Sequence, residues 1–375
     1  MKVPISKICL NRSDLHNLVK TIHSGWITQG RMVEEFEESV AGYVGSRYAI
    51  ATSSCTTALH LALLSVGVKP QDEVIVPSYT FIAPVNAILY CQARPRFVDI
   101  DLNTYNIDPD RIEGAVTKRT KAIIVVHQLG LPADIIRIKK VADAYGLKVI
   151  EDAACAIGSK YYSKMVGSLG DIACFSFHPK KLITTAEGGM ITTKSKNYAE
   201  LCRSLRNHGA SVSDLTRHGM SRIVFESYKY SGYNYRMPDI CAALGISQIK
   251  RIEDILEKRL QLAQRYNEAL GRSKSVTIPH VPKYATHNYQ SYNIILNDSC
   301  PVSREELMNL LLKKGISTRR IMAVHLEPAY SLKYGKAKLP NTVKAFRRAL
   351  LLPIYNQMSK VEQEFVISSV LSLTQ

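Results

Sequence analysis

The sequence contains no long apolar run and no paired-cysteine motif. No stretch of its 375 residues approaches the roughly 18 apolar residues of a membrane span, and the first segment, MKVPISKICLNRSDLHNL, lacks the apolar core of a signal peptide. The eight cysteines are scattered, without a C-x-x-C pair or a Cys/His cluster of zinc spacing. These absences predict a cytoplasmic protein with reduced thiols, no metal site and no membrane partner.

Acidic residues are also comparatively few: 32 Asp and Glu stand against 49 Lys and Arg, for a net charge of +17. Such a positive field attracts nucleic acids, membrane surfaces or anionic metabolites. The cations are interleaved with acids and apolar residues, as on solvated helix faces. Because no nucleic-acid recognition motif accompanies the charge, we expect no nucleic-acid partner, and an anionic small substrate fits the charge at least as well.

Short apolar runs alternate with helix-like segments between residue 47 and about residue 193. This alternation is typical of a parallel sheet with crossover helices and predicts an α/β fold. Segments such as TTALHLALLSVG have apolar residues at spacings of three and four, which indicates helices on both faces of the sheet. Seven strands are predicted: Tyr48–Thr52, Glu73–Pro77, Arg96–Ile100, Ala122–His127, Lys148–Asp152, Cys174–Phe177 and Gly189–Thr193.

The pattern changes after about residue 250. A long helix from Arg251, RIEDILEKRLQLAQRYNEAL, is followed by the strand-like YNIIL and by two more amphipathic helices. This arrangement is typical of a smaller α+β unit. We therefore predict a large domain over residues 1–250 and a small domain over residues 251–375, with the helix from Arg251 as the hinge and the N-terminal segment able to pack on the small domain.

Two consecutive acids, Glu151 and Asp152, end the predicted strand KVIED at the edge where open α/β sheets bind ligands. Side chains alternate along a strand, so only one of the two acids can point into the crevice. An acid there could hold a proton on a heteroaromatic nitrogen, as a pyridine cofactor requires. A carboxylate that caps the next helix or binds a metal explains the pair equally well at this point.

Two lysines, Lys180 and Lys181, lie on a turn in CFSFHPKKLITTAEGGMIT. A lysine near a phosphate-bearing aldehyde can form an imine with it, and the hydroxyl of Ser176 could meet the phosphate. Taken alone, adjacent lysines on a turn are more often solvated surface charge.

A third element, ATSSCTTALHLAL, breaks a strand at Ser53 and Ser54 and begins a helix near Thr56. Helix starts present free N–H groups and the positive end of the helix dipole, so this turn can bind an anion. It lacks the glycine pattern of a P-loop or a dinucleotide fingerprint, which argues against a nicotinamide oxidoreductase. Ordinary capping by Ser or Thr would explain the turn on its own.

The anion turn, the aromatic-bearing turn PSYTF, the acid-ended strand and the lysine turn occur together in this order. In this combination the chain closely resembles the DegT/DnrJ/EryC1/StrS family of sugar aminotransferases. The resemblance runs from GWITQGRMVEEFE to the LP-containing C-terminal segments, and its specific motifs are EDAAxAxG, FSFHPxKxITTxEGG and GYNYRM. It implies the pyridoxal-phosphate (PLP) transferase fold of type I aminotransferases, with PLP as the cofactor.

The resemblance also implies roles for individual residues. Lys181 matches the lysine that forms the imine with PLP and moves the proton, whereas Lys180 falls at a variable position. Asp152 matches the acid that pairs with the pyridine nitrogen. The further cofactor contacts that it implies are Thr56, Thr57 and Ser176 at the phosphate, Phe81 on the ring, Cys155 near the phenolic oxygen, and Asn234 at the phosphate of the neighbouring subunit's cofactor. The Asn234 contact implies a homodimer with shared active sites.

Three residues depart from the pattern of many family members. Cys155 stands where many have glutamine, and because cysteine is a weak hydrogen-bond donor, the phenolic oxygen would rely on water or another partner. Cys55 and Ala186 stand where many have glycine. We expect Ala186 only to stiffen its turn.

The implied reaction moves an amino group from an amino acid, expected to be L-glutamate, to a nucleotide-linked ketosugar, expected to be a 4-keto-6-deoxyhexose, for aminosugar or surface-polysaccharide biosynthesis. The candidates to bind the substrate are Arg236, Arg319, Arg320 and His325, each of which could equally be surface charge. The alternatives are a dehydratase of the same family, which carries histidine at the lysine position, and a non-catalytic regulatory protein, which would be expected to lose the lysine or the acid. This chain keeps both Lys181 and Asp152, which favours transamination.

Overall fold

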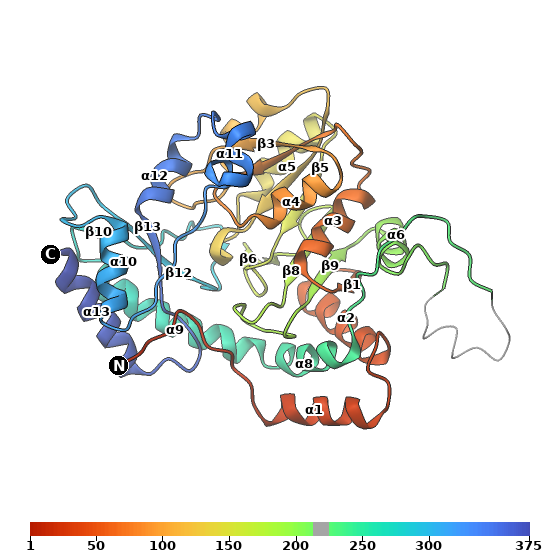
Figure 1. Ribbon diagram of the computed structural model, residues 1–375, viewed down its shortest axis with the longest axis horizontal. Helices are drawn as coiled ribbons and strands as arrows, with labels where there is room; N and C mark the ends of the chain where they lie inside the picture. Colours follow the sequence, from red (N-terminus) through yellow and green to blue (C-terminus); the bar gives the residue numbers. More distant parts are fainter. Residues whose placement is uncertain (213–224) are drawn as a thin grey trace.

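A seven-stranded sheet lies at the centre of the computed structural model, which describes residues 1–212 and 225–375 (Figure 1). The strand order is β1-β9-β8-β5-β4-β2-β3. β9 pairs antiparallel with β1 and β8, whereas the remaining neighbours pair in parallel. The strands are β1 (Tyr48–Thr52), β2 (Glu73–Pro77), β3 (Arg94–Val98), β4 (Thr120–Val126), β5 (Lys148–Asp152), β8 (Ile172–Ser176) and β9 (Gly189–Thr193). The predicted α/β fold with a mostly parallel sheet is confirmed.

Three strands begin two residues earlier than the sequence predicts, namely β3, β4 and β8. Backbone pairing explains two of these shifts, because Glu73 of β2 pairs with Arg94 on one side and with Thr120 on the other. Both strands therefore extend beyond the apolar residues that identified them. The apolar pattern records burial, and it misses polar strand ends that are held by hydrogen bonds.

Helices cover both faces of the sheet, as alternation along β4 illustrates. Ile124 packs into the core formed with α3 (Cys55–Ser65), α4 (Ala83–Tyr90) and α6 (Lys196–Arg206), whereas Ile123 and Val125 pack into the core on the opposite face, with α5 (Ile135–Ala144). α2 (Arg31–Val44) and α8 (Asp239–Ile249) share a further core with the β1 end of the sheet. α1 (Arg12–His23) packs against α8.

The C-terminal elements build a second core around a three-stranded antiparallel sheet of β10 (Val276–Thr277), β12 (Tyr292–Leu296) and β13 (Ala349–Leu352). α9 (Ile252–Leu270) leads from α8 into this region, where α10 (Arg304–Lys313) and α13 (Lys360–Thr374) pack (Figure 1). Val3 is fully buried in the same core and forms a parallel bridge with Ile316. The division into domains at residue 250 stays a prediction.

Short elements complete the fold: β6 (Lys160–Tyr161), β7 (Lys164–Met165) and β11 (Ala285–Thr286) form a small sheet, and α11 (Pro328–Tyr334) and α12 (Pro340–Arg348) precede β13. Within residues 1–212 and 225–375, no helix is both long and apolar enough to cross a membrane. All eight cysteines are free thiols.

Candidate active site

The ends of β5 and β8 and the start of α3 meet at one edge of the central sheet. Cys55, the first residue of α3, is buried, and burial raises the pKa of its thiol well above the usual value. The same pKa is influenced by the charges of Asp152, Lys181 and Cys155, so these side chains lie close together. The structure therefore brings the predicted acid and lysine to one site.

The two consecutive acids face different surroundings. The Glu151 carboxylate accepts hydrogen bonds from His127 Nε2 at 3.0 Å and from the backbone N–H groups of Gly167, Leu169 and Gly170 at 3.0, 2.9 and 2.7 Å. Burial alone would raise the pKa of Glu151, but the bonds from His127 and the backbone outweigh burial and lower it. Glu151 thus ties a loop to the sheet.

Asp152 is the acid that faces the site. It is 5% exposed, and among the described residues its carboxylate accepts one hydrogen bond, from Ala154 N to Oδ1 at 3.1 Å. Burial raises its pKa, and the nearby Lys181 only partly offsets this effect. A positively charged partner beside Asp152 would therefore be favourable.

Lys181 lies on the connection between β8 and β9. Its backbone N–H donates to His178 O at 2.8 Å, and Gln290 Nε2 holds the preceding carbonyl, Lys180 O, at 2.7 Å. The Lys181 side chain is half-buried and its Nζ donates to Cys155 Sγ at 3.1 Å, whereas Lys180 is exposed. The turn therefore directs one lysine into the site and the other into solvent.

The Lys181 amine is surrounded by groups that favour its charged form. Burial lowers the pKa of Lys181, but the adjacent Cys155, to which the amine donates a hydrogen bond, and the nearby Asp152 carboxylate outweigh burial and raise it. These neighbours therefore favour the protonated amine in the cofactor-free protein.

The start of α3 supplies the predicted anion turn. Ser54 is the N-cap, and its side chain accepts from Thr57 N at 3.2 Å while Ser54 N donates to Thr57 Oγ1 at 3.1 Å, which completes a capping box. The hydroxyl of Thr57 is thus already engaged with the helix start. Thr56 is half-buried and lies in the first turn of the helix.

Gly189 allows β9 to pass this helix start, a role that our sequence interpretation missed. A Cβ at Gly189 would lie 2.4 Å from the backbone C and O of Ser54 and 2.6 Å from Cys55 N, closer than side chains pack. The signal was present as the second glycine of the EGG motif.

The remaining predicted cofactor contacts lie at the surface near this edge. Phe81 is 62% exposed in the connection after β2, and Ser176 is half-buried at the end of β8. Asn234 is exposed, and its neighbour Tyr235 accepts a hydrogen bond from Ser53 N at 2.8 Å, which holds the GYNYRM segment beside the anion turn. The roles of these residues stay predictions.

The candidate substrate residues fall into different environments. Arg319 is exposed and influences the pKa of His178, so it lies near the lysine turn. Arg236 donates to Asn207 Oδ1, and Arg320 stacks on Phe346 at 5.0 Å.

His325 is 1% exposed and its Nδ1 lies 2.7 Å from Ser78 Oγ. Its role as a substrate contact stays a prediction. Ser78 Oγ also accepts from His325 N at 3.0 Å. These two contacts hold the segment after β2 against the C-terminal part of the chain.

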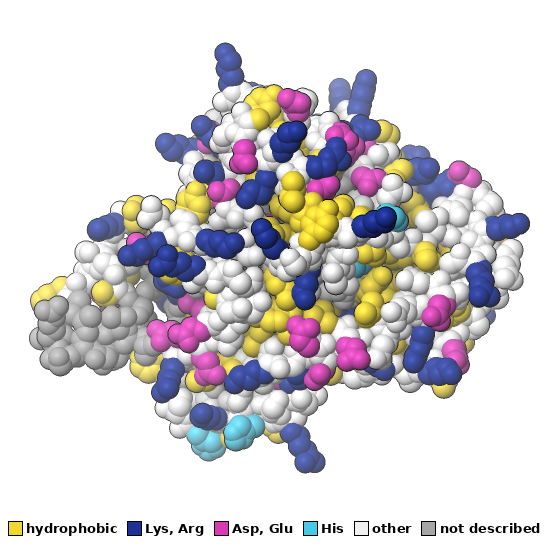
Figure 2. Space-filling model, turned by 180° about the vertical axis from the view of Figure 1, so that it is seen from behind, with side chains coloured by type: hydrophobic (Ala, Val, Ile, Leu, Met, Phe, Trp, Pro, Cys, Tyr) yellow, Lys and Arg dark blue, Asp and Glu magenta, His cyan; other side chains and the backbone are white. Residues whose placement is uncertain are grey.

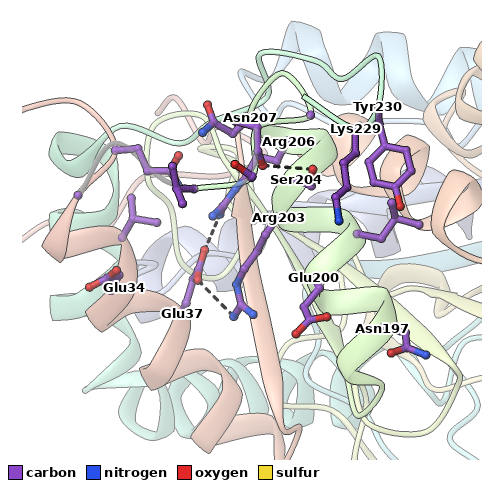
Figure 3. A pocket seen from close by; sticks show the side chains of 18 residues that line it. Glu34, Glu37, Asn197, Glu200, Arg203, Ser204, Arg206, Asn207, Lys229 and Tyr230 are labelled. Atoms are coloured by element: carbon purple, nitrogen blue, oxygen red, sulfur yellow. Dashed lines mark hydrogen bonds and ion pairs between the residues drawn. The ribbon is translucent and has the colours of Figure 1, made fainter. Parts of the chain in front are cut away.

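A pocket of about 830 Å³ lies between α2 and α6 (Figure 3). None of the predicted site residues lines it. Its floor holds Glu37, whose Oε1 accepts from Arg206 Nη1 at 2.5 Å and whose Oε2 lies 3.9 Å from Arg203 Nη2. These charges are already paired, so we assign the chemistry to the sheet edge.

The residues at the sheet edge fit PLP. A lysine amine, a buried carboxylate with capacity for a cationic partner, and a capped helix start match the aldehyde, ring nitrogen and phosphate of that cofactor. Within the described parts of the chain, no group of three or more His, Cys, Asp or Glu residues could hold a metal ion.

Comparisons with known proteins identify the family of the chain. Residues 9–371 match the model of the DegT/DnrJ/EryC1/StrS aminotransferase family. The spore coat polysaccharide biosynthesis protein SpsC of Bacillus subtilis is 37% identical over 373 residues, covering 98% of this chain and 96% of SpsC.

Two solved structures share the fold. The putative sugar aminotransferase Spr1654 of Streptococcus pneumoniae, in its PMP form, has a TM-score of 0.93 at 27% identity, covering 100% of this chain and 99% of that one. Helicobacter pylori PseC, an aminotransferase involved in the biosynthesis of pseudoaminic acid, has a TM-score of 0.92 at 26% identity with the same coverage. The chain belongs to the DegT/DnrJ/EryC1/StrS aminotransferase family, the family of sugar aminotransferases that its motifs predicted, and it is a PLP-dependent aminotransferase.

Proposed function

We propose that this protein transfers the amino group of L-glutamate to a nucleotide-linked ketosugar, most simply a 4-keto-6-deoxyhexose, for aminosugar or surface-polysaccharide biosynthesis. The observation that carries the proposal is the presence of a half-buried Lys181 near a buried Asp152 at one edge of the sheet. Two relatives support a glycan setting, because SpsC is named for spore coat polysaccharide biosynthesis and PseC is involved in the biosynthesis of pseudoaminic acid.

The residues that would hold PLP surround the lysine turn. Lys181 would hold its aldehyde carbon and Asp152 would face its ring nitrogen. When bound, the cofactor supplies an electron sink for the carbon that gains or loses the amino group. The other residues that we assign to the cofactor are Thr56, Thr57 and Ser176 at the phosphate, Phe81 over the ring and Cys155 beside Lys181.

Lys181 is also the group that we assign to proton movement. Its amine donates to Cys155 Sγ, so a neighbour already orients it towards the centre of the site. Asp152 keeps its charge when a cationic ring nitrogen lies beside it, because that partner offsets the burial that raises its pKa. Cys155 stands where the family resemblance implies a glutamine in many members; as a weak hydrogen-bond donor it would leave the cofactor oxygen to water or another partner.

The substrate class rests on charge. On the face seen in Figure 2, Lys and Arg side chains are scattered over the whole surface and interleaved with Asp and Glu. A net charge of +17 attracts a diphosphate without the need for one dense patch. We assign three cations to the substrate: Arg319, which lies near the lysine turn, Arg236, and the exposed Arg320.

We further propose a cytoplasmic homodimer in which Asn234 serves the partner's cofactor. Asn234 is exposed beside the anion turn, so its side chain has room to reach another subunit. We also retain the division into domains over residues 1–250 and 251–375.

The cofactor assignment is tested by the visible absorbance of the purified protein. We expect a band that borohydride bleaches, because a lysine joined to PLP absorbs visible light and its reduced form does not. Lys181→Ala should abolish the band, and the adjacent, exposed Lys180→Ala should keep it. If Lys180→Ala alone removed the band, the assignment of Lys181 would be wrong.

The substrate assignment is tested in the reverse direction. Aminosugar nucleotides that differ in the position of the amino group are added one at a time to the PLP-loaded protein, and loss of the visible band is followed. A 4-amino-6-deoxyhexose nucleotide should change the spectrum, and a 3-amino isomer should not. A response to the 3-amino compound alone would replace the proposed substrate.

A further inference from the structure

His60, in the middle of α3, is buried against the segment that carries Asn234. Its side chain is 3% exposed, and its Nδ1 lies 3.2 Å from the hydroxyl of Tyr235. Its ring meets the ring of Tyr233 edge-on, with 4.9 Å between centroids and an interplanar angle of 63°. His60 therefore contacts both residues that flank Asn234.

The backbone of this segment is held on two sides. Tyr233 N donates to Leu205 O at 2.7 Å, and Tyr235 N donates to Arg206 O at 3.0 Å, so the end of α6 fixes one edge. Tyr235 O accepts from Ser53 N at 2.8 Å on the other edge. The segment is thus clamped between α6 and the turn that starts α3.

The side chains of the segment alternate between two sides. The rings of Tyr233 and Tyr235 stack at 4.9 Å with an interplanar angle of 11°, so both lie on the side of His60. In an extended segment the intervening side chain points the opposite way, and Asn234 is indeed exposed. The contacts of His60 with the two tyrosines consequently set the direction in which Asn234 projects.

The protonation of His60 follows from its second nitrogen. Nε2 is buried and has no hydrogen-bond partner among the described residues. Burial lowers the pKa of His60, so the ring is neutral at neutral pH. A proton on Nε2 would be a buried donor without an acceptor, so the proton belongs on Nδ1, which donates to the Tyr235 hydroxyl.

We infer that His60 is a positioning residue that links the two active sites of the proposed dimer through α3. The first turn of α3 carries Thr56 and Thr57, which we assign to the subunit's own cofactor phosphate. His60, about one turn further along the same helix, aligns Asn234 for the phosphate of the partner's cofactor. This inference rests on the proposed function, because it uses the assigned roles of α3 and Asn234.

The test compares binding of PLP with binding of pyridoxal, which lacks the phosphate. Cofactor-free protein is titrated with each compound, and the visible band gives the two dissociation constants. His60→Phe keeps a ring but loses the hydrogen bond, and Tyr235→Phe removes only the hydroxyl. Each should weaken PLP by roughly three- to tenfold, the range expected for one misplaced hydrogen bond to a charged group, and should leave pyridoxal unchanged.

The double variant and a control distinguish positioning from simple loss of stability. His60→Phe combined with Tyr235→Phe should weaken PLP no more than either change alone, because both remove the same bond. Tyr90→Phe is the control. The ring of Tyr90 also lies near His60, with 5.8 Å between the ring centroids, but Tyr90 lies outside the Asn234 segment. Removing its hydroxyl should change neither dissociation constant.

Equal losses for PLP and pyridoxal would overturn the inference, and so would additive losses in the double variant. Unchanged PLP binding in His60→Phe would overturn it as well, while leaving the proposed function intact. If the unmodified protein bound no PLP, the proposed function itself would fail, and the two failures are therefore distinguishable.

Discussion

Glu151 and Asp152 are neighbours in the chain, yet folding gives their charges opposite consequences. The charged form of Glu151 is stabilised by His127 and three backbone N–H groups, whereas burial disfavours the charged form of Asp152. His127 Nδ1 accepts from Ala133 N at 3.1 Å, so its proton lies on Nε2, facing Glu151. The charge of Glu151 therefore stabilises the fold, whereas the charge of Asp152 is unfavourable in the cofactor-free protein and is available to a cationic cofactor nitrogen.

We predict opposite changes in stability when these two charges are removed from the cofactor-free protein at pH 7. Glu151→Gln should lower the free energy of unfolding by about 2 kcal/mol or more, because the amide keeps only one acceptor oxygen and its NH2 group faces donors that lose theirs. Asp152→Asn should raise it, because a buried charge disappears, although the variant should lose PLP more readily. Urea unfolding measures both, and each variant is the control for the other.

The pH dependence has a definite sign for each acid. The folded pKa of Glu151 is lowered, so its contribution to stability is present above the unfolded value near 4.5 and is lost as pH falls through the folded pKa. The folded pKa of Asp152 is raised, so stability decreases as pH rises through it. The cost of Glu151→Gln should therefore shrink towards acidic pH, and a constant cost would contradict this account.

Much of the site at this scale could be predicted from the sequence, since Lys181 and Asp152 were found by motif. The conformation of Ala186 could not. Its φ is +66°, in the left-handed region where alanine is strained, so the residue does more than stiffen the turn as we expected. The burial of His325 was equally hidden, because it depends on Ser78, far away in the chain.

The start of α3 and β9 pass each other closely enough to require a glycine. We predict that Gly189→Ala lowers the free energy of unfolding by roughly 1–3 kcal/mol and weakens PLP binding, because the backbone of Ser54 must move. Gly42→Ala, within α2 and with nothing within 4 Å of its new Cβ, is the control and should stabilise the protein by up to about 1 kcal/mol. Thermal unfolding and PLP titration measure both effects.

Helix and strand positions were largely predictable, but the contacts that end them were not. The start of α2 is an example, because its N-cap, Gly30, has no side chain to cap the helix. Asp239 supplies the acceptor instead, taking hydrogen bonds from Gly30 N at 2.7 Å and Val33 N at 3.0 Å. A cap from more than two hundred residues away leaves no local signal in the sequence.

The proposed dimer makes each active site depend on two chains. We predict that Lys181→Ala and Asn234→Ala, each defective alone in PLP-dependent activity, regain activity when mixed after unfolding and refolding together. In a mixed dimer one site receives both wild-type residues, so random pairing should restore roughly a quarter of the wild-type sites. Activity no higher than the sum of the two variants would contradict a shared site.

The excess of positive charge should also be visible in substrate binding. We predict that added salt raises the KM for the nucleotide-linked sugar more than the KM for L-glutamate, because the diphosphate carries more charge and screening weakens long-range attraction. Steady-state kinetics at low and high sodium chloride measure both constants. If salt raised the two KM values equally, the net charge of the protein would not explain its substrate class.

At the scale of the molecule, the sequence indicated the sheet but not its order. β9 is inserted between β1 and β8 and runs against both, although β1 and β9 are far apart in the chain. The order of the strands depends on how the helices together cover the two faces of the sheet. The pattern of apolar residues along the chain does not show this order.

The pairing of β5 has a consequence for how the enzyme could change. Glu151 pairs with Ala173 and Asp152 with Cys174, and this register decides which carboxylate looks towards Lys181. A slip of one residue would exchange the two side chains. Glu151 would then face the cofactor, and Asp152 would face Gly167 and Gly170. Insertions or deletions inside this strand should therefore abolish catalysis even where the protein still folds.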